Sequence, residues 1–116
     1  MSLIKELSEF DEQRILVEWM NFKKILFYHI PNGGYRNARE ARNLKLNGVK
    51  PGVPDICIPV PKKSFHGLYI ELKRVDNFKI SPSQEFWMKE LSKNGYDVVI
   101  ANGSRNAIKH IENYFK

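Results

Sequence analysis

The sequence has a single cysteine, no long apolar run, no internal repeat and no low-complexity tract. One thiol, Cys57, cannot form an internal disulfide, and its apolar neighbours predict a small buried side chain. No apolar run approaches the ~20 residues that a transmembrane helix needs. Acidic side chains follow the first residues too closely for a secretory signal, so we expect an intracellular protein in a reducing compartment.

Acidic residues are in the minority. There are 13 Asp and Glu against 19 Lys and Arg, which gives a formal net charge of +6 at pH 7. A basic balance suits a polyanion such as nucleic acid, although many basic proteins bind none. The 116 residues are 42% hydrophobic and 28% charged, as is typical of one globular domain, and we expect that domain to span 1–116.

Two short apolar stretches, 52–58 and 68–73, dominate the middle of the chain. Both are bounded by Gly, Pro, Ser and Lys, a pattern that predicts β-strands. Because side chains alternate along a strand, Glu71 and Lys73 share one face of the second stretch and its aliphatic residues share the other. If the strands pair over a common core, Asp55 and Glu71 converge at one edge with Lys73 beside them.

Two carboxylates and a lysine at one sheet edge form a candidate catalytic site. Paired oxygen ligands suit Mg²⁺ or Mn²⁺, which bind proteins through one or two carboxylates together with substrate phosphates. A partly desolvated lysine can orient or deprotonate an attacking water, or hold a phosphate oxygen. This combination favours hydrolysis of a phosphodiester bond.

The residues around this site resemble a known signature. Pro54-Asp55 followed by Glu71-Leu72-Lys73 resembles the motif of the PD-(D/E)xK nuclease superfamily. The ordered set over nearly the whole chain, from Glu12 to about Phe115, is similar to the VRR-NUC branch, the virus-type replication-repair nucleases. That set also contains Gly48, Gly52-Val53, Ser81-Pro82-Ser83-Gln84 and Gly95-Tyr96-Asp97-Val98-Val99. The resemblance implies an α/β fold with a restriction-endonuclease-like core, in which a mixed central sheet is flanked by helices.

The resemblance also implies roles for the residues of the two strands. Asp55 and Glu71 would be the principal metal ligands, with the carbonyl of Leu72 beside them. Lys73 would position or activate the attacking water. Mg²⁺ or Mn²⁺ would be the cofactor.

Family members usually carry a glutamate on the first helix, just ahead of a glutamine, that joins the metal site. Glu12, immediately before Gln13, fits this pattern best as an outer or third ligand. Glu9 and Glu18 fit less well. A solvated helix face is the alternative interpretation of each glutamate.

The family places a further glutamine near the active-site lysine, and Gln84 matches it. An amide can hold a phosphate oxygen or a water without changing the charge balance of the site. A local explanation stands beside this one, because Ser81, Pro82 and Gln84 form a capping box at a helix start.

Cations gather before Pro54-Asp55 and between the two strands. Those over 36–45 recur at three-residue spacing, so they would project from one side of a helix. They could line the approach to the site and neutralise phosphates, or be an ordinary solvated surface. The loop over 61–67 is a plain turn or a second arm along a duplex. The candidate DNA-binding residues are Arg36, Arg39, Arg42, Lys45, Lys50, Lys62 and Lys63.

The rest of the chain gives a simple order of elements. We predict helices over 8–24, 37–47, 81–94 and 105–114, and further strands over 25–30 and 96–101. The last strand is nearly all apolar, which predicts a central strand covered on both faces. His29 has no partner at ligand spacing and is expected to be structural.

The family resemblance implies a metal-dependent DNA endonuclease. Its small stand-alone members resemble Holliday-junction resolvases, which act as homodimers on branched DNA, and this format suggests a phage or mobile element and the cytoplasm of a bacterial or phage-infected cell. Two antiparallel strands cut symmetrically require two sites related by a two-fold axis. A flap- or fork-nicking nuclease and a non-catalytic DNA-binding module are the alternatives; the intact Asp55, Glu71 and Lys73 count against the second.

Overall fold

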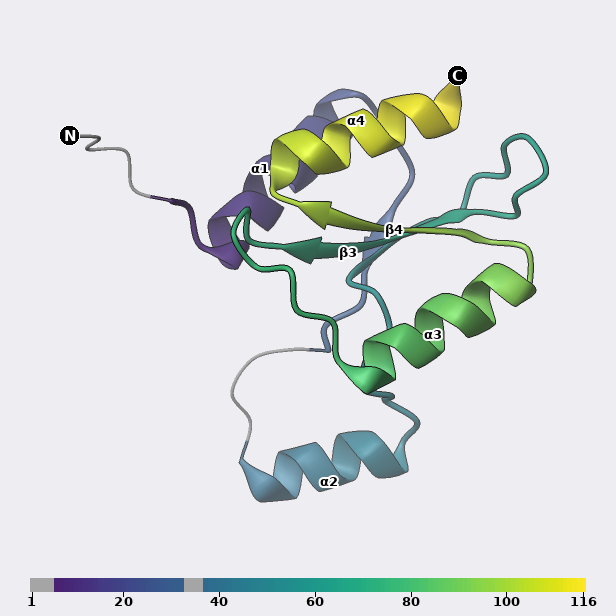
Figure 1. Ribbon diagram of the computed structural model, residues 1–116. Coiled ribbons are helices and arrows are strands. Elements are labelled where there is room, and N and C mark those ends of the chain that lie inside the picture. Colours follow the sequence, from purple (N-terminus) through teal and green to yellow (C-terminus); the bar gives the residue numbers. More distant parts are fainter. Residues whose placement is uncertain (1–5, 33–36) are drawn as a thin grey trace.

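Four helices and four strands make up the computed structural model, which describes residues 6–32 and 37–116 (Figure 1). In chain order they are α1 (Glu9–Phe22), β1 (Tyr28–His29), α2 (Ala38–Leu46), β2 (Ile56–Ile58), β3 (Leu68–Lys73), α3 (Pro82–Lys93), β4 (Asp97–Asn102) and α4 (Ser104–Phe115). This is the predicted order, with β1 shorter than expected. Among the described residues, no helix has both the length and the apolar character needed to cross a membrane.

The strands form one mixed sheet in the order β1-β2-β3-β4. β1, β2 and β3 are antiparallel neighbours, while β4 runs parallel to β3. A parallel pair needs a long crossover, and α3 supplies it. The prediction that β4 is central was wrong, because β4 lies at an edge of the sheet. β4 is apolar because helices pack on both of its faces. Those helices bury its side chains although β4 has a neighbouring strand on one side only.

The helices begin where local chemistry favours a start. Ser8 precedes α1, and its side chain accepts a hydrogen bond from the backbone N of Asp11 at 3.1 Å. Ser81 precedes α3 and forms the predicted capping box with Gln84, with Pro82 at the first helical position. Both caps satisfy amide groups that the first turn of a helix leaves unpaired.

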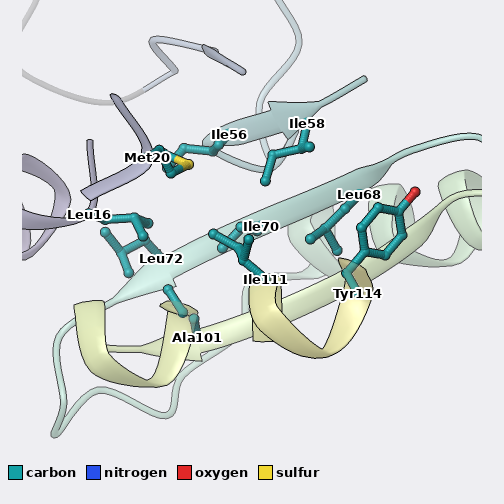
Figure 2. Close-up of a cluster of buried hydrophobic side chains, with 11 residues drawn as sticks. Leu16, Met20, Ile56, Ile58, Leu68, Ile70, Leu72, Ala101, Ile111 and Tyr114 are labelled. Carbon is teal, nitrogen blue, oxygen red and sulfur yellow. The ribbon is translucent and has the colours of Figure 1, made fainter. Parts of the chain in front are cut away.

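The core lies between the sheet and two helices. α1 and α4 cover one face together, and α3 covers the opposite face (Figure 1). Figure 2 shows the side chains between them, in which Leu16 and Met20 from α1 and Ile111 from α4 meet the aliphatic residues of the strands. The alternation predicted for β3 is present, since its even-numbered residues, Leu68, Ile70 and Leu72, are fully buried in this cluster.

Helix α2 stands apart from this body (Figure 1). It has no buried residue, although its side chain at Leu44 is half-buried. Asn37 caps it by accepting a hydrogen bond from the backbone N of Glu40 at 2.8 Å. A helix of nine residues without a packed face is marginal in water, so contacts outside this body would stabilise it.

Candidate active site

The pairing of β2 with β3 brings the two acidic residues together. Ile56 lies opposite Ile70, so the next residues outward, Asp55 and Glu71, are neighbours at the C-terminal end of β3. Oδ2 of Asp55 accepts a hydrogen bond from the backbone N of Leu72 at 2.8 Å, which fixes the carboxylate at that end. The convergence expected from strand alternation is therefore present.

Glu71 and Lys73 share the polar face of β3, and each has only 6% of its surface exposed. Burial, together with a hydrogen bond to Asp55 and the negative charge of that residue, raises the pKa of Glu71 to about 9, although Lys73 opposes the shift. Two carboxyl groups in one desolvated site cannot both be charged cheaply. The site therefore retains a proton or requires a positive charge.

Gln84 reaches this site from the first turn of α3. Its Oε1 accepts a hydrogen bond from Nζ of Lys73 at 3.3 Å and another from the backbone N of Ser81 at 2.9 Å. The two explanations that the sequence offered for this glutamine are therefore compatible. The capping box holds the amide in place, and the amide in turn holds the lysine.

Gly52 fixes the loop that leads into β2. It has φ of +87°, and a Cβ atom there would lie 2.4 Å from the backbone C of Ser83. No side chain fits so close to another backbone. The start of α3 therefore packs directly against this glycine.

Glu12, the expected ligand on the first helix, binds α4 instead. Its Oε1 accepts hydrogen bonds from the backbone N and the Oγ of Ser104, at 3.1 and 2.9 Å, and only 6% of its surface is exposed. α4 follows Gly103, which supplies no side-chain cap. A carboxylate at a helix N-terminus is favourable, so Glu12 has a structural role that links α1 to α4.

Glu9 is the glutamate of α1 that interacts with the candidate site. Burial and the negative charge of Asp55 raise its pKa, while Lys73 lowers it. Glu18 is exposed and lies 3.8 Å from Arg14 in an ion pair. The structure thus favours Glu9 as the α1 glutamate whose charge interacts with Asp55 and Lys73. The choice of Glu12 as the metal ligand stays a prediction.

The signal that separates these glutamates is helical spacing. Glu9 precedes Gln13 by four residues, which places both on the same side of α1. Gln13 lies on the site side, since its Nε2 is 3.1 Å from Nδ1 of His29. Glu12 is adjacent to Gln13 in sequence and therefore points about 100° away.

His29 holds the backbone of the site. Its Nδ1 lies 2.8 Å from the carbonyl oxygen of Asp55, and the backbone N of Ile30 donates to the same oxygen at 2.6 Å. Because a carbonyl oxygen only accepts, a hydrogen bond at this distance places a proton on Nδ1. His29 therefore has the structural role that we expected, because it fixes the backbone at Asp55.

The oxygen atoms at the site fit a divalent cation that keeps several waters. Within residues 6–32 and 37–116, no three Asp, Glu, His or Cys side chains lie close enough to form a complete metal site by themselves. Asp55 and Glu71 nevertheless offer two carboxylates in one desolvated place, with the Leu72 carbonyl beside them in sequence. The raised pKa of Glu71 marks a place where a bound cation would relieve repulsion.

Comparison with known families decides the assignment of this arrangement. The family model described as the VRR-NUC domain matches residues 7–105. The chain belongs to the VRR-NUC family. Membership implies a nuclease of the PD-(D/E)xK type.

A solved structure supports the VRR-NUC assignment at the level of the whole fold. A protein described as a VRR_NUC domain protein superposes with a TM-score of 0.83 at 32% sequence identity. The match covers 96% of this chain and 90% of that one. A comparison with curated proteins gave no match.

Most candidate DNA-binding residues of this VRR-NUC domain lie on or near α2. Arg39, Arg42 and Lys45 project from that helix and are exposed, as is Lys50 in the following loop. Arg36 lies outside the described residues. In sequence these cations precede Gly52 and Asp55.

Lys62 and Lys63 lie at the other end of the strands. Nζ of Lys63 donates to the carbonyl oxygen of Asn113 at 2.9 Å, and Lys62 lies 5.8 Å from the centre of the Phe115 ring. The six residues of β3 separate this loop from Lys73 by about 17 Å. The structure thus gives both lysines contacts with α4 and does not bring them to the candidate site.

Proposed function

We propose that this protein is a metal-dependent endonuclease that hydrolyses phosphodiester bonds in branched DNA, such as Holliday junctions, and that it acts as a homodimer. One observation carries the proposal. Asp55, Glu71 and Lys73 lie together at the end of β3, with the carboxyl group of Glu71 desolvated and Lys73 held by Gln84. Family membership supplies the nuclease class, and the net positive charge suits the substrate.

The side chains divide the chemical work. Asp55 and Glu71, with the Leu72 carbonyl, would hold Mg²⁺ or Mn²⁺, which stabilises negative charge developing on the phosphate when it is bound. Lys73 donates a hydrogen bond to the attacking water or to a phosphate oxygen. Gln84 keeps the ammonium group of Lys73 in place, because its own amide oxygen is fixed by the backbone of Ser81.

The exposed cations of α2 support DNA as the substrate. Arg39, Arg42 and Lys45 extend from a helix that the rest of the described chain does not bury. Phosphates would neutralise these charges and supply the contacts that α2 lacks. A second copy related by a two-fold axis would place a second site on the opposite strand of a junction.

A panel of substrates tests this proposal. The purified protein is incubated with labelled linear duplex, 5′ flap and four-way junction in Mg²⁺, Mn²⁺ or EDTA. We expect paired symmetric nicks in the junction, in metal only, from a protein that is a dimer in solution. Cutting confined to the flap would favour the flap- or fork-nicking alternative. Binding of junctions without cutting of any substrate would identify a non-catalytic module.

Glu9 is the α1 carboxylate that we place in the metal site, and two matched variants test this. Glu9→Gln should lower metal affinity or the cleavage rate roughly 10- to 100-fold, as does loss of a carboxylate that supports a metal site. Glu12→Gln should leave the rate within about twofold and lower the free energy of unfolding by about 1 kcal/mol, because a neutral amide caps α4 more weakly.

Cleavage rates at several Mg²⁺ concentrations and thermal melts distinguish the two glutamates. The assignment is wrong if Glu12→Gln removes activity while the melting temperature stays unchanged, or if Glu9→Gln cuts at the wild-type rate throughout the titration. Glu18→Gln is the matched control, since Glu18 is exposed on the same helix and paired only with Arg14.

A further inference from the structure

An exposed aromatic ring stands in the segment that joins two residues of the candidate site. Residues 74–80 run from Lys73 at the end of β3 to the start of α3, where Gln84 contacts that same lysine (Figure 1). Phe78, within this segment, has 75% of its surface exposed. Within the part of the chain that the structure describes, Phe78 does not belong to the hydrophobic core or to the side chains packed against it.

The exposure of Phe78 is not a consequence of a loose loop. Nδ2 of Asn102 donates to the carbonyl oxygens of Arg74 and Asn77, at 3.0 and 2.7 Å. The backbone N of Asn77 donates to Arg74 as well, and the backbone N of Lys79 donates to Oδ1 of Asn77 at 3.0 Å. Asn102 is the register partner of Lys73 in the sheet, so the loop is anchored beside the candidate site.

Charges of both signs lie next to Phe78. Arg74 is paired with Asp76 at 3.4 Å and with Glu6 at 3.7 Å, so one cation is shared between two acids. Lys79 follows the ring directly and forms no ion pair within the described part of the chain. A phosphate beside the ring would meet this free ammonium group.

We propose that Phe78 stacks on a nucleobase that has left the duplex stack at the branch point of the substrate. The inference rests on the proposed function, because the loop that carries Phe78 begins next to Lys73 and leads to α3, where Gln84 contacts the same lysine. An aromatic ring binds the face of any base, and apolar side chains that enter base steps favour distorted DNA. The ring therefore selects DNA with an exposed base over a continuous duplex, in which every base face is covered.

A binding cycle between protein and DNA tests the stacking contact without requiring cleavage. Binding of a labelled forked duplex is measured in EDTA by fluorescence anisotropy, in the Asp55→Asn background. The fork carries either a normal base or an abasic site at its first unpaired position. Phe78→Ala should weaken binding of the intact fork about tenfold, and should have little effect on the abasic fork, because the stacking partner is already missing.

Two further variants separate stacking from other effects. Phe78→Trp should restore the affinity for the intact fork, since a larger ring stacks as well. Phe22→Ala is the matched control, because Phe22 is 80% exposed at the far end of α1. This variant should bind both forks as tightly as the parent protein does. All variants should melt at the parent temperature, since neither ring is buried.

The proposal is overturned if Phe78→Ala weakens both forks equally, if it matches Phe22→Ala, or if Phe78→Trp fails to restore binding. These outcomes differ from failure of the proposed function. A wild-type protein that cuts no substrate would refute the endonuclease, while the difference between intact and abasic forks would still report on Phe78.

Discussion

Asp55→Asn should lower the rate of DNA cleavage by at least about a thousandfold while the fold is kept. Asparagine retains an oxygen that can accept the hydrogen bond that Asp55 receives from the backbone of Leu72. It lacks the negative charge that the proposed metal ligand supplies. Single-turnover cleavage of a junction in excess Mg²⁺ measures the loss, and a thermal melt of the same sample confirms that the variant is folded.

The matched control is Asp97→Asn. Asp97 begins β4 opposite Leu68, at the end of the sheet away from the candidate site. This variant should cut at the wild-type rate. Cleavage by Asp55→Asn within tenfold of the wild type, or an equal loss in both variants, would place the chemistry elsewhere in the molecule.

Much of this site follows from local sequence. The alternation along β3 puts Glu71 and Lys73 on one face, and an antiparallel partner brings Asp55 to the same end. The capping box likewise places Gln84 in the first turn of α3. These predictions succeed because each depends on local structure. Side chains alternate every two residues along a strand, and the capping box lies within the first turn of a helix.

The error at β4, and the choice that the sequence left between two glutamates, concern the relative placement of elements. Glu9 and Glu12 are one turn apart. Helical spacing places them on different sides of α1, but only the placement of the helix shows that Glu12 contacts Ser104 and that the charge of Asp55 acts on Glu9. The apolar sequence of β4 indicates that both of its faces are covered. It does not show whether the strand has one neighbouring strand or two. Phe78 could be recognised as exposed only after the loop around it had been placed.

The second large effect concerns stability in the absence of metal. Glu71 has an ordinary pKa of 4.5, which burial and Asp55 raise to about 9 in the folded protein. The folded state therefore binds this proton more tightly than the unfolded chain does. Its contribution to the free energy of unfolding is greatest below pH 4.5, falls as the pH rises toward 9, and is constant above that value.

We expect the metal-free protein to lose on the order of 3 kcal/mol of unfolding free energy from this group between pH 5 and pH 8. Glu71→Gln removes the titration and should flatten the profile, so that at pH 8 in EDTA the variant is more stable than the wild type. Denaturant unfolding at several pH values gives both curves. Glu112→Gln, a change at an exposed glutamate of α4, should follow the wild type.

Metal should make the wild type more stable than Glu71→Gln at pH 8, the reverse of the order expected in EDTA. A Mg²⁺ ion held by Asp55 and Glu71, as we propose, would require both carboxylates to be charged. Mg²⁺ should therefore raise the stability of the wild type at pH 8 and leave Glu71→Gln nearly unchanged. The proton and the cation are alternative ways to neutralise the same pair, and stabilisation by Mg²⁺ should therefore shrink at pH 5. A wild type that is equally stable at pH 5 and pH 8 in EDTA would show that Asp55 and Glu71 are not coupled as the structure has them.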